Sequence, residues 1–497
     1  MPTFPCPADR PEEEEAIVAE AKAEAVKEMP TRRIAPQEDH TPTEDTEDIP
    51  WNEVLKKLPK PQQLTAGELN DFSKWELWAE VSQEDLGHHR HTWQQYPKHR
   101  YTVQLTNTAG GAVVNASVQL VDPQGQILWR ARTDAQGRAE LWAYYCQESA
   151  PSLEGLRIQG SAAAYDFELL DVKAFQEGIN FHTLPLACVS QAVVDVAFVV
   201  DATGSMSDEI YYLQAEILDV MQRAKDTLRG GDLRLGSLFY RDLSDTYLTR
   251  RHALSANIGS TVSFMQAQSA GGGGDGPEAV EAALETTLDH LNWRDHATTR
   301  LLFLVLDAPP HQAADNVKRM QAATLRAAAM GIQIIPVSCS GIAQSTEYLM
   351  RSMALATNGT YTFLTNHSGI GQKHLEPSTT SYEVEHLNDL LLRLLIARSR
   401  LKGCGNAPPN TEGVVHTQAN TVPESWSFYP NPTAGPFTIE SGGPDVVGFL
   451  LDSDGKLLQR FTVQGTFELD LSRYAAGQYW LKLDNQQAAQ PIILNKM

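Results

Sequence analysis

Between residues 190 and 402 the chain alternates short apolar runs with longer stretches that place apolar residues on one helical face. The apolar runs, such as VVDVAFVVD, RLLFLVLD and IQIIPVSC, are near-continuous, which is typical of strands buried on both faces. The stretches between them, such as PEAVEAALETTLDHL, begin near a proline or end at a glycine, as helices do. Strands separated by helices predict an α/β domain with a parallel, doubly wound, Rossmann-like sheet.

The flanking segments follow a different pattern. Residues 99–189 consist of short apolar runs separated by glycine turns (TAGG, DPQG, TDAQG) and predict a small β-sandwich. The TDAQGRAEL hairpin resembles immunoglobulin-like and carboxypeptidase-regulatory-like sandwiches. Residues 425–497 return to short strands and predict a second small all-β domain. Residues 403–424, which contain a Pro-Pro pair and small polar residues, are expected to be a linker.

The N-terminal hundred residues divide into two parts. Residues 1–50 are acidic, contain several prolines and lack apolar residues for a core, so we expect a disordered segment. Residues 51–98 contain several tryptophans and leucines, and Thr65 followed by Glu68 forms a capping-box pattern. We therefore predict two or three short helices there that pack on the next domain.

Composition narrows the possible functions. A formal net charge of −22 over 497 residues disfavours binding to nucleic acid. No apolar run reaches the length of a membrane span, and the first thirty residues contain no recognisable signal peptide. Five cysteines are too few for a disulfide-stapled scaffold. Cys146 and Cys188 each end a strand-like run, and they are the pair we expect to be bonded if one forms.

Polar residues follow the first buried strand of the α/β domain at a spacing that suits a cation. Asp201, Thr203 and Ser205 offer one carboxylate and two hydroxyls at alternate positions of a tight turn. In a doubly wound sheet, ligands bind beyond the carboxyl ends of the strands, where this turn lies. Hard cations such as Mg²⁺, Mn²⁺ and Ca²⁺ prefer such oxygen ligands. Each aspartate considered alone is also compatible with a helix N-cap or a turn cap.

The segment DATGSM resembles the first loop of the metal-ion-dependent adhesion site of von Willebrand factor type A domains. The segments GGGGDGPEAVEAAL and LVLDAPPH stand where the second and third metal loops of that family belong, and the resemblance covers residues 191–402. It implies that Asp201, Thr203, Ser205, Asp275 and Asp307 hold one Mg²⁺, with Mn²⁺ and Ca²⁺ as alternatives.

One position departs from the family pattern. The second loop usually presents a threonine, and here it presents Asp275. A further carboxylate makes the metal less electrophilic, so we expect a weaker or non-acidic ligand, or an Asp275 that acts through water. His311 lies next to the third loop, where it is either a ligand contact or, more commonly, an exposed loop residue.

The C-terminal strands resemble a second family. The ordered set SFYPNPTAGPFTI, LLDSDGKLLQRF, LDLSRYAAGQYWLKL and PIILNKM is similar to the type A sorting domain of the type IX secretion system of Bacteroidota. This resemblance implies interaction with the secretion machinery, removal of the tail and a secreted or outer-surface location. Export also requires a signal peptide, and we expect the segment that carries it to be missing from this sequence.

These features predict a secreted or surface protein whose metal bridges it to a protein or surface ligand. One alternative is a type A domain that serves as an assembly subunit of an ATPase-type complex. Another is a structural envelope protein whose metal only stabilises the fold. No nucleophile elbow, phosphate-binding loop, zinc-protease motif or kinase signature is present, so we do not expect an enzyme.

Overall fold

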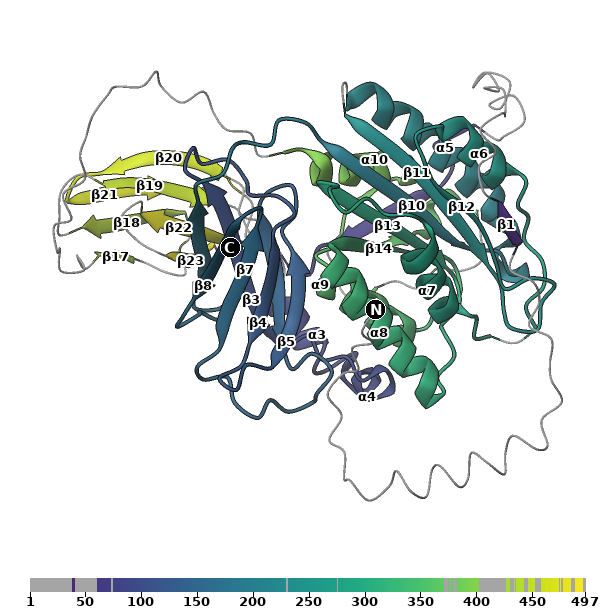
Figure 1. Cartoon of the computed structure of the whole chain (residues 1–497), viewed down its shortest axis with the longest axis horizontal. Helices are drawn as coiled ribbons and strands as arrows, with labels where there is room; N and C mark the ends of the chain where they lie inside the picture. Colours follow the sequence, from purple (N-terminus) through teal and green to yellow (C-terminus); the bar gives the residue numbers. More distant parts are fainter. Residues whose placement is uncertain are drawn as a thin grey trace.

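The structure is a computed structural model of the 497-residue chain. The parts of the chain that it describes are residues 38–40, 60–72, 75–228, 231–274, 276–370, 374, 377–378, 382–401, 426–429, 433, 435–441, 446–451, 457–472, 474, 477–483 and 488–494. A β-sandwich, blue in Figure 1, lies between the yellow C-terminal strands and the teal and green α/β domain. The predicted linker at 403–424 lies outside the described residues.

The α/β domain is built on a nine-stranded sheet with the order β1-β12-β11-β10-β13-β14-β15-β2-β16. Its central strands are β10 (Val193–Asp201), β11 (Asp232–Tyr240), β12 (Thr249–Ser255), β13 (Thr299–Leu306), β14 (Ile332–Ser338) and β15 (Tyr361–Leu364). Strands β11, β10, β13, β14 and β15 are parallel to one another, and β10 and β13 are buried along nearly their whole length. The parallel core that the apolar runs predicted is therefore present.

Helices cover both faces of this sheet, as Figure 1 shows. Val196, Phe198 and Val200 of β10 share an apolar core with α5 (Ile210–Thr227), α6 (Ile258–Gln266) and α10 (Leu387–Ser399). Val199, on the other face of β10, belongs to the core that includes α7 (Val280–His290), α8 (Ala314–Met330) and α9 (Gln344–Ala356). Alternate residues of one strand therefore face different helical layers, which is the doubly wound arrangement.

The sheet is mixed, whereas we predicted a parallel one. Strand β12 is antiparallel to β11, and at the other side β2 (Thr65–Leu69) is antiparallel to both β15 and β16 (Val384–His386). The capping-box interpretation of Thr65–Leu69 as the start of a helix was wrong. The segment forms a strand because β15 and β16 offer it hydrogen bonds on both sides and because Ala66 and Leu69 are buried there.

The N-terminal region after β2 is helical. Short helices follow at α3 (Trp75–Val81), η2 (Gly87–His89) and α4 (Arg90–Trp93), as predicted for this region. The indole N–H of Trp93 donates to the carbonyl oxygen of Ser345 at 2.9 Å, which fixes the region to the α/β domain. Within the segment expected to be disordered, β1 (Glu38–His40) is a strand parallel to β12, and the other residues of 1–50 lie outside the described ones.

The β-sandwich consists of two sheets. One has the order β5-β4-β7-β8, formed by β4 (Ser117–Val121), β5 (Ile127–Arg132), β7 (Arg157–Ala162) and β8 (Tyr165–Leu169). The other contains β3 (His99–Asn107), β6 (Arg138–Ala143) and β9 (Ile179–Leu184). Trp129 and Trp142, one from each sheet, are fully buried, and both contact the ring of Tyr145. These aromatic contacts fill the space between the sheets.

The C-terminal strands form two sheets, one of which continues into the β-sandwich. Strands β17 (Trp426–Tyr429), β18 (Pro436–Ser441) and β21 (Thr466–Asp470) form a separate sheet. The other strands are β19 (Val446–Leu451), β20 (Leu457–Val463), β22 (Gly477–Leu483) and β23 (Ala488–Leu494). Strand β23 pairs with β9, so a seven-stranded sheet spans both domains. Trp480 is fully buried with its ring centroid 4.8 Å from that of Phe175.

The prediction that Cys146 and Cys188 form a disulfide with each other is wrong. Both sulfurs take part in disulfides, but the two residues lie at opposite ends of β3. Cys146 follows β6, which ends beside the start of β3, whereas Cys188 Sγ lies 3.3 Å from the side-chain nitrogen of Asn107 at the end of β3. A nine-residue strand spans roughly 26 Å, far beyond the ~7 Å between α-carbons that a disulfide allows. Cys339 is free and buried.

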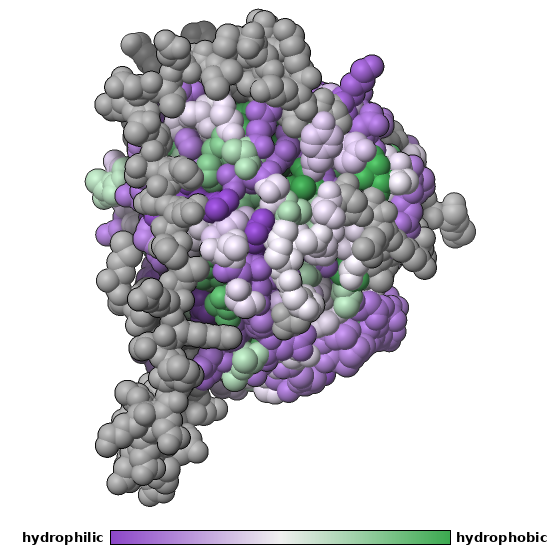
Figure 2. Space-filling model, turned by 90° about the vertical axis from the view of Figure 1, so that its right-hand side faces the viewer, coloured by the Kyte–Doolittle hydropathy of each residue, from purple (hydrophilic) through white to green (hydrophobic). Residues whose placement is uncertain are grey.

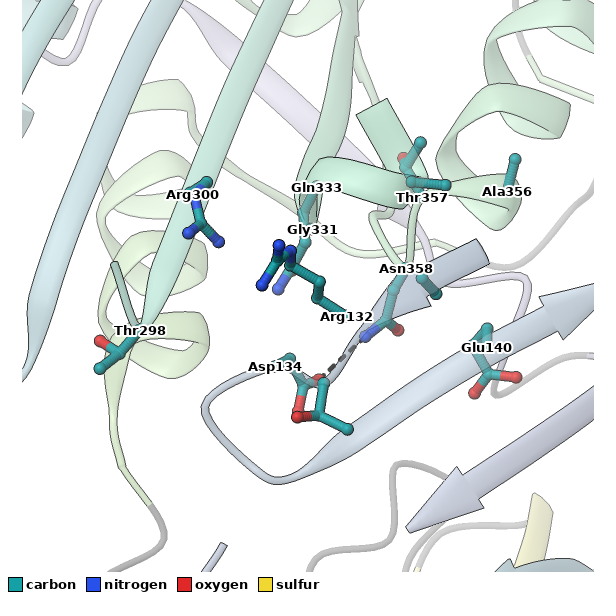
Figure 3. Close-up of a pocket in the computed structure, with 13 residues that line it drawn as sticks. Arg132, Asp134, Glu140, Thr298, Arg300, Gly331, Gln333, Ala356, Thr357 and Asn358 are labelled. Atoms are coloured by element: carbon teal, nitrogen blue, oxygen red, sulfur yellow. Dashed lines mark hydrogen bonds between the residues drawn. The ribbon is translucent and has the colours of Figure 1, made fainter. Parts of the chain in front are cut away.

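The β-sandwich packs on the α/β domain at the amino ends of β13 and β14. Figure 3 shows the pocket at this junction, where Asn358 donates to Asp134 Oδ2 at 2.9 Å. Arg300, another lining residue, donates to Asn115 Oδ1 at 3.1 Å. The polar groups of this pocket join two domains, and it lies at the opposite end of the sheet from the predicted metal residues.

Candidate metal centre

The candidate site lies at the carboxyl ends of β10 and β13. These neighbouring strands are paired in parallel with Val200 opposite Val305, so Asp201 and Asp307 both emerge just beyond that pair. On the other side of β10, Asp201 pairs with Tyr240, the last residue of β11. The sheet thus brings Asp201 and Asp307 together, although 105 residues of chain separate them.

The first loop arranges its oxygens by short-range hydrogen bonds. Asp201 Oδ1 accepts from the backbone N–H of Thr203 at 2.8 Å and from its hydroxyl at 2.7 Å. The hydroxyls of Thr203 and Ser205 are 3.2 Å apart. The 3-10 helix η3 (Gly204–Asp208) begins directly after Thr203, so that Ser205, in its first turn, stays beside the other two side chains. The predicted spacing therefore produces one cluster of oxygens.

Backbone hydrogen bonds join the second loop to the first. Gly271 donates to the carbonyl oxygen of Ala202 at 3.0 Å, and Gly204 donates to that of Gly272 at 3.1 Å. Gly272 has a φ of +78°, and a Cβ there would lie 2.2 Å from a carboxylate oxygen of Asp245, so only glycine fits. The glycine run thus lets the second loop lie directly against the first. Asp275 lies outside the described residues.

Glu278 is a site residue that the sequence reasoning missed. Its backbone N–H donates to the carbonyl oxygen of Pro309 at 2.9 Å, which joins the second loop to the third. The residue is 2% exposed. The only signal in the sequence was its place three residues after Asp275, in a segment that also reads as the start of a helix. Its involvement depends on the contact with the third loop.

The carboxyl groups of the site affect one another strongly. Burial and, to a smaller extent, the charge of the nearby Asp307 together raise the pKa of Asp201 to about 7. Burial likewise raises the pKa of Glu278 to about 9, together with the charges of Asp201 and other acidic neighbours. Arg241, beside the first loop, donates to the carbonyl oxygens of Ala202 and Ser269 at 3.0 and 2.9 Å. The site therefore gathers carboxyl groups in a place sheltered from water, where their ionised forms are unfavourable unless a positive charge is bound beside them.

The donor set fits a hard divalent cation. Asp201 Oδ2 and Glu278 Oε2 are buried and have no well-formed hydrogen bond within the described part of the chain, although the Tyr240 hydroxyl lies close enough to the Asp201 carboxylate to lower its pKa. Leaving such oxygens unpaired is costly, and a cation bound between them would remove the cost. Within the described ranges, no three His, Cys, Asp or Glu side chains form a ready-made metal group. The predicted set depends on two hydroxyls and on Asp275, which such a grouping does not include.

His311 lies at the rim. Its Nε2 is 2.7 Å from Asp242 Oδ1, and the side chain is one quarter exposed. The residue is therefore held by an acidic neighbour and is not a free loop side chain.

Comparison with known proteins identifies one part of the chain. Residues 427–495 match the family model described as the secretion system C-terminal sorting domain. The chain ends in a type IX secretion sorting domain. This match agrees with the strands β17 to β23, and it points to a protein that is secreted or held at the outer surface and that interacts with the secretion machinery.

Two curated proteins match shorter segments. A putative ariadne-like RING finger protein of Acanthamoeba polyphaga mimivirus is 33% identical over 133 residues, which are 26% of this chain and 13% of that protein. An alpha-protein kinase of Dictyostelium discoideum is 32% identical over 121 residues, 24% of this chain and 19% of the kinase. The chain spans less than a fifth of each relative, so neither named activity is carried over to it.

No helix of the described residues is long and apolar enough to span a membrane.

Proposed function

We propose that the α/β domain is a von Willebrand factor type A domain that binds one divalent metal and uses it to hold a ligand at the cell surface or outside the cell. One observation carries the proposal. Buried carboxylates from separate loops and the hydroxyls of Thr203 and Ser205 meet at the carboxyl end of a doubly wound sheet, and two of the carboxylate oxygens lack a hydrogen-bond partner among the described residues.

The residues have distinct roles in this proposal. Asp201 supplies a carboxylate and positions the Thr203 hydroxyl through their hydrogen bond. Thr203 and Ser205 supply neutral hydroxyl oxygens, and Asp307 supplies a second carboxylate from the neighbouring strand. The resemblance assigns Asp275 to the same shell. Bound metal would hold the three loops together and act as a Lewis acid toward an oxygen of the ligand.

The sorting domain supports this role indirectly. A protein directed out of the cell reaches the place where a surface ligand would be bound. Figure 2 shows one face of the molecule, on which hydrophilic and neutral residues dominate and apolar ones form small separate patches. A binding mode based on a metal and polar contacts fits such a face better than docking through a broad apolar surface does.

The test is calorimetric titration of the full chain with Mg²⁺, Mn²⁺ and Ca²⁺, alongside Asp201→Ala. Asp166→Ala, at an exposed strand position of the β-sandwich, is the matched control. We expect one saturable ion in the wild type and the control, and none in Asp201→Ala. If the folded wild type binds no ion, the proposal is wrong. If ions bind but no surface ligand needs them, the metal only stabilises the fold.

A further inference from the structure

Two arginines from different domains meet at the pocket between the β-sandwich and the α/β domain. Arg132 belongs to β5 and Arg300 to β13, and Figure 3 shows their guanidinium groups turned toward one another. Nη1 of Arg132 and Nη1 of Arg300 lie 3.4 and 3.1 Å from the same atom, Asn115 Oδ1. The two positive charges of this arginine pair therefore share one neutral acceptor.

Neither arginine forms an ion pair with a carboxylate of the described residues. Arg300 is 4% exposed, and besides Asn115 it donates only to the backbone carbonyl oxygens of Arg294 and Asp295. Arg132 donates only to the carbonyl and side-chain oxygens of Asn115. Burial and the charge of Arg132 lower the pKa of Arg300 to about 10, although nearby aspartates act in the opposite direction. The arginine pair thus lacks a counter-charge in a place where positive charge is costly.

The two carboxylates that line the same pocket are engaged by other groups. Asp134 accepts from the side chain of Asn358 and from the backbone N–H of Arg138, each at 2.9 Å. Glu140 accepts from the guanidinium groups of Arg100 and Arg138 at 2.8 and 2.7 Å. Neither carboxylate therefore compensates the arginine pair directly.

Another polar side chain lines the pocket without a partner. Gln333, on β14, is 4% exposed, and its Oε1 has no hydrogen-bond partner among the residues that the structure describes. Turned over, the amide presents N–H donors to the pocket instead. Gly331 precedes this strand, and a Cβ there would lie 2.9 Å from the Cβ of Arg132 and 3.4 Å from Arg300 Nη1. The glycine therefore lets the arginine pair lie close to the start of β14.

We propose that this pocket binds one tetrahedral oxyanion, inorganic phosphate or sulfate, between Arg132 and Arg300, and that the anion strengthens the junction of the two domains. Guanidinium groups donate paired, charge-assisted hydrogen bonds to such anions. The anion neutralises the arginine pair and accepts from the Gln333 amide. Because each domain supplies one arginine, an anion bound to both adds contacts across the junction. The inference is independent of the proposed metal centre, which lies at the other end of the sheet.

The test is calorimetric titration of the full chain with inorganic phosphate, in chelator and with the ionic strength held constant by chloride. The variant is Arg132→Gln, at a partly exposed position. Its matched control is Arg157→Gln, which removes the same charge from a partly exposed ion pair with Glu168 on the same sheet. We expect the wild type and the control to bind one phosphate, and Arg132→Gln to bind it roughly tenfold or more weakly. Sulfate should bind in the same pattern.

Gln333→Glu provides a second variant, because it places a carboxylate beside the arginine pair in the position of the anion. Without phosphate it should unfold at a higher temperature than the wild type, and phosphate should give it no saturable gain. High concentrations of phosphate stabilise folded proteins in general, so the gain that saturates is the quantity to compare.

Equal phosphate affinity in Arg132→Gln and the wild type would overturn the inference. So would a stabilisation by phosphate that chloride reproduces at the same ionic strength, since that result indicates screening of charge and not a bound anion. A folded wild type that binds no phosphate or sulfate would also overturn it, and would leave the proposed metal function untouched.

Discussion

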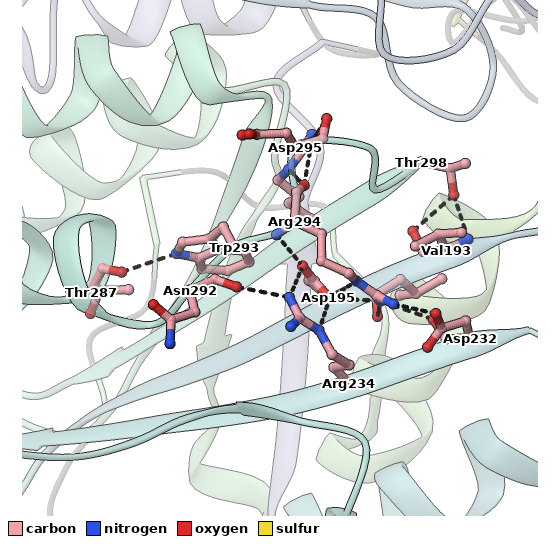
Figure 4. Close-up of polar contacts among 12 residues, drawn as sticks. Val193, Asp195, Asp232, Arg234, Thr287, Asn292, Trp293, Arg294, Asp295 and Thr298 are labelled. Carbon is pink, nitrogen blue, oxygen red and sulfur yellow. Dashed lines mark hydrogen bonds and ion pairs between the residues drawn. The ribbon is translucent and has the colours of Figure 1, made fainter. Parts of the chain in front are cut away.

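Strand β10 carries two buried aspartates, Asp195 near its start and Asp201 at its end, and their surroundings are opposite. Asp195 accepts from Arg234 Nε and Nη2 at 2.9 and 2.8 Å and from the backbone and side chain of Arg294 (Figure 4). Burial alone would raise the pKa of Asp195, but these arginine contacts outweigh it and hold the pKa below its usual value. No arginine of the described residues contacts Asp201 in this way, and its pKa rises to about 7.

The two ends of the sheet therefore differ in where the compensating positive charge comes from. At the amino end the chain supplies it, and the network continues from Arg294 to Arg300, whose guanidinium donates to the carbonyl oxygen of Arg294 and to Asn115 of the β-sandwich. The ion pairs and hydrogen bonds at the amino end therefore join the α/β domain to the β-sandwich. At the carboxyl end the described residues bring carboxylates together with two unpaired oxygens. The carboxyl end of the sheet is therefore suited to bind a cation from solution.

Removing Asp195 should have the largest effect on stability. Asp195→Ala leaves the guanidinium groups of Arg234 and Arg294 without their shared acceptor in a mostly buried place. We expect a loss of roughly 3 to 5 kcal/mol in the free energy of unfolding, measured by denaturant titration without metal. Metal affinity should be unchanged at denaturant concentrations where the variant is folded. A loss below roughly 1 kcal/mol would contradict a structural role for the ion pairs of Asp195.

Asp201→Ala should show the opposite pattern. We expect metal affinity to fall on the order of 100-fold or more, which is about 2.7 kcal/mol. Stability without metal should change far less than in Asp195→Ala, because losing the two hydrogen bonds from Thr203 is offset by removing a buried carboxyl group whose Oδ2 has no partner among the described residues. Paired measurements of unfolding with chelator and with excess metal separate the two effects. A variant that unfolds early in chelator yet binds metal normally would reverse our assignment of the two ends.

The pH dependence should separate the two ends as well. Asp201 and Glu278 have pKa values raised to about 7 and 9, so below those values the folded, metal-free protein binds protons that the unfolded chain releases. Their contribution to metal-free stability is therefore favourable at low pH and is lost as the pH rises toward 9. Asp195, with its lowered pKa, contributes stability at neutral pH that is lost only in acid. Metal affinity should fall as the pH drops below about 7.

Unfolding curves in chelator between pH 5.5 and 9 test this prediction. The slope of stability with pH should flatten in a double variant carrying Asp201→Asn and Glu278→Gln. A slope that persists unchanged in the double variant would show that other groups cause it.

A smaller effect is expected at the link to the β-sandwich. Asn115 has a φ of +59°, accepts from Arg300 and donates to the carbonyl oxygen of Asp295 at 2.8 Å. Asn115→Ala should lower the free energy of unfolding by about 1 to 2 kcal/mol. Asn115→Gly, which tolerates the backbone conformation, isolates the hydrogen bonds and should cost less. Equal losses in the two variants would mean that the backbone conformation adds nothing.

The smallest effect concerns the departure at Asp275. Asp275→Thr restores the residue that the type A family usually presents and removes one carboxylate. We expect the metal-loaded variant to bind an aspartate-containing peptide a few-fold more tightly than the wild type, measured by calorimetry with Mg²⁺ present. Binding that does not change would indicate that Asp275 leaves the electrophilicity of the metal unaltered.

The sequence alone determined the features that depend on local pattern. Apolar runs and helical spacing identified the buried parallel strands and the helices between them, because each period reports which faces of an element are buried. The spacing of Asp201, Thr203 and Ser205 determined a cluster of oxygens, since a tight turn brings alternate residues together. The C-terminal strands with their motifs identified the sorting domain.

Only the tertiary structure decided what depends on partners distant in the chain. Thr65–Leu69 is a strand because β15 and β16 bond it on both sides, and these long-range bonds outweigh a local helix signal. The two half-cystines, Cys146 and Cys188, are kept apart by the length of β3. Glu278 belongs to the candidate site because its backbone meets Pro309 on another loop. Local periodicity contains no information about which distant segments meet, and packing and register supply it.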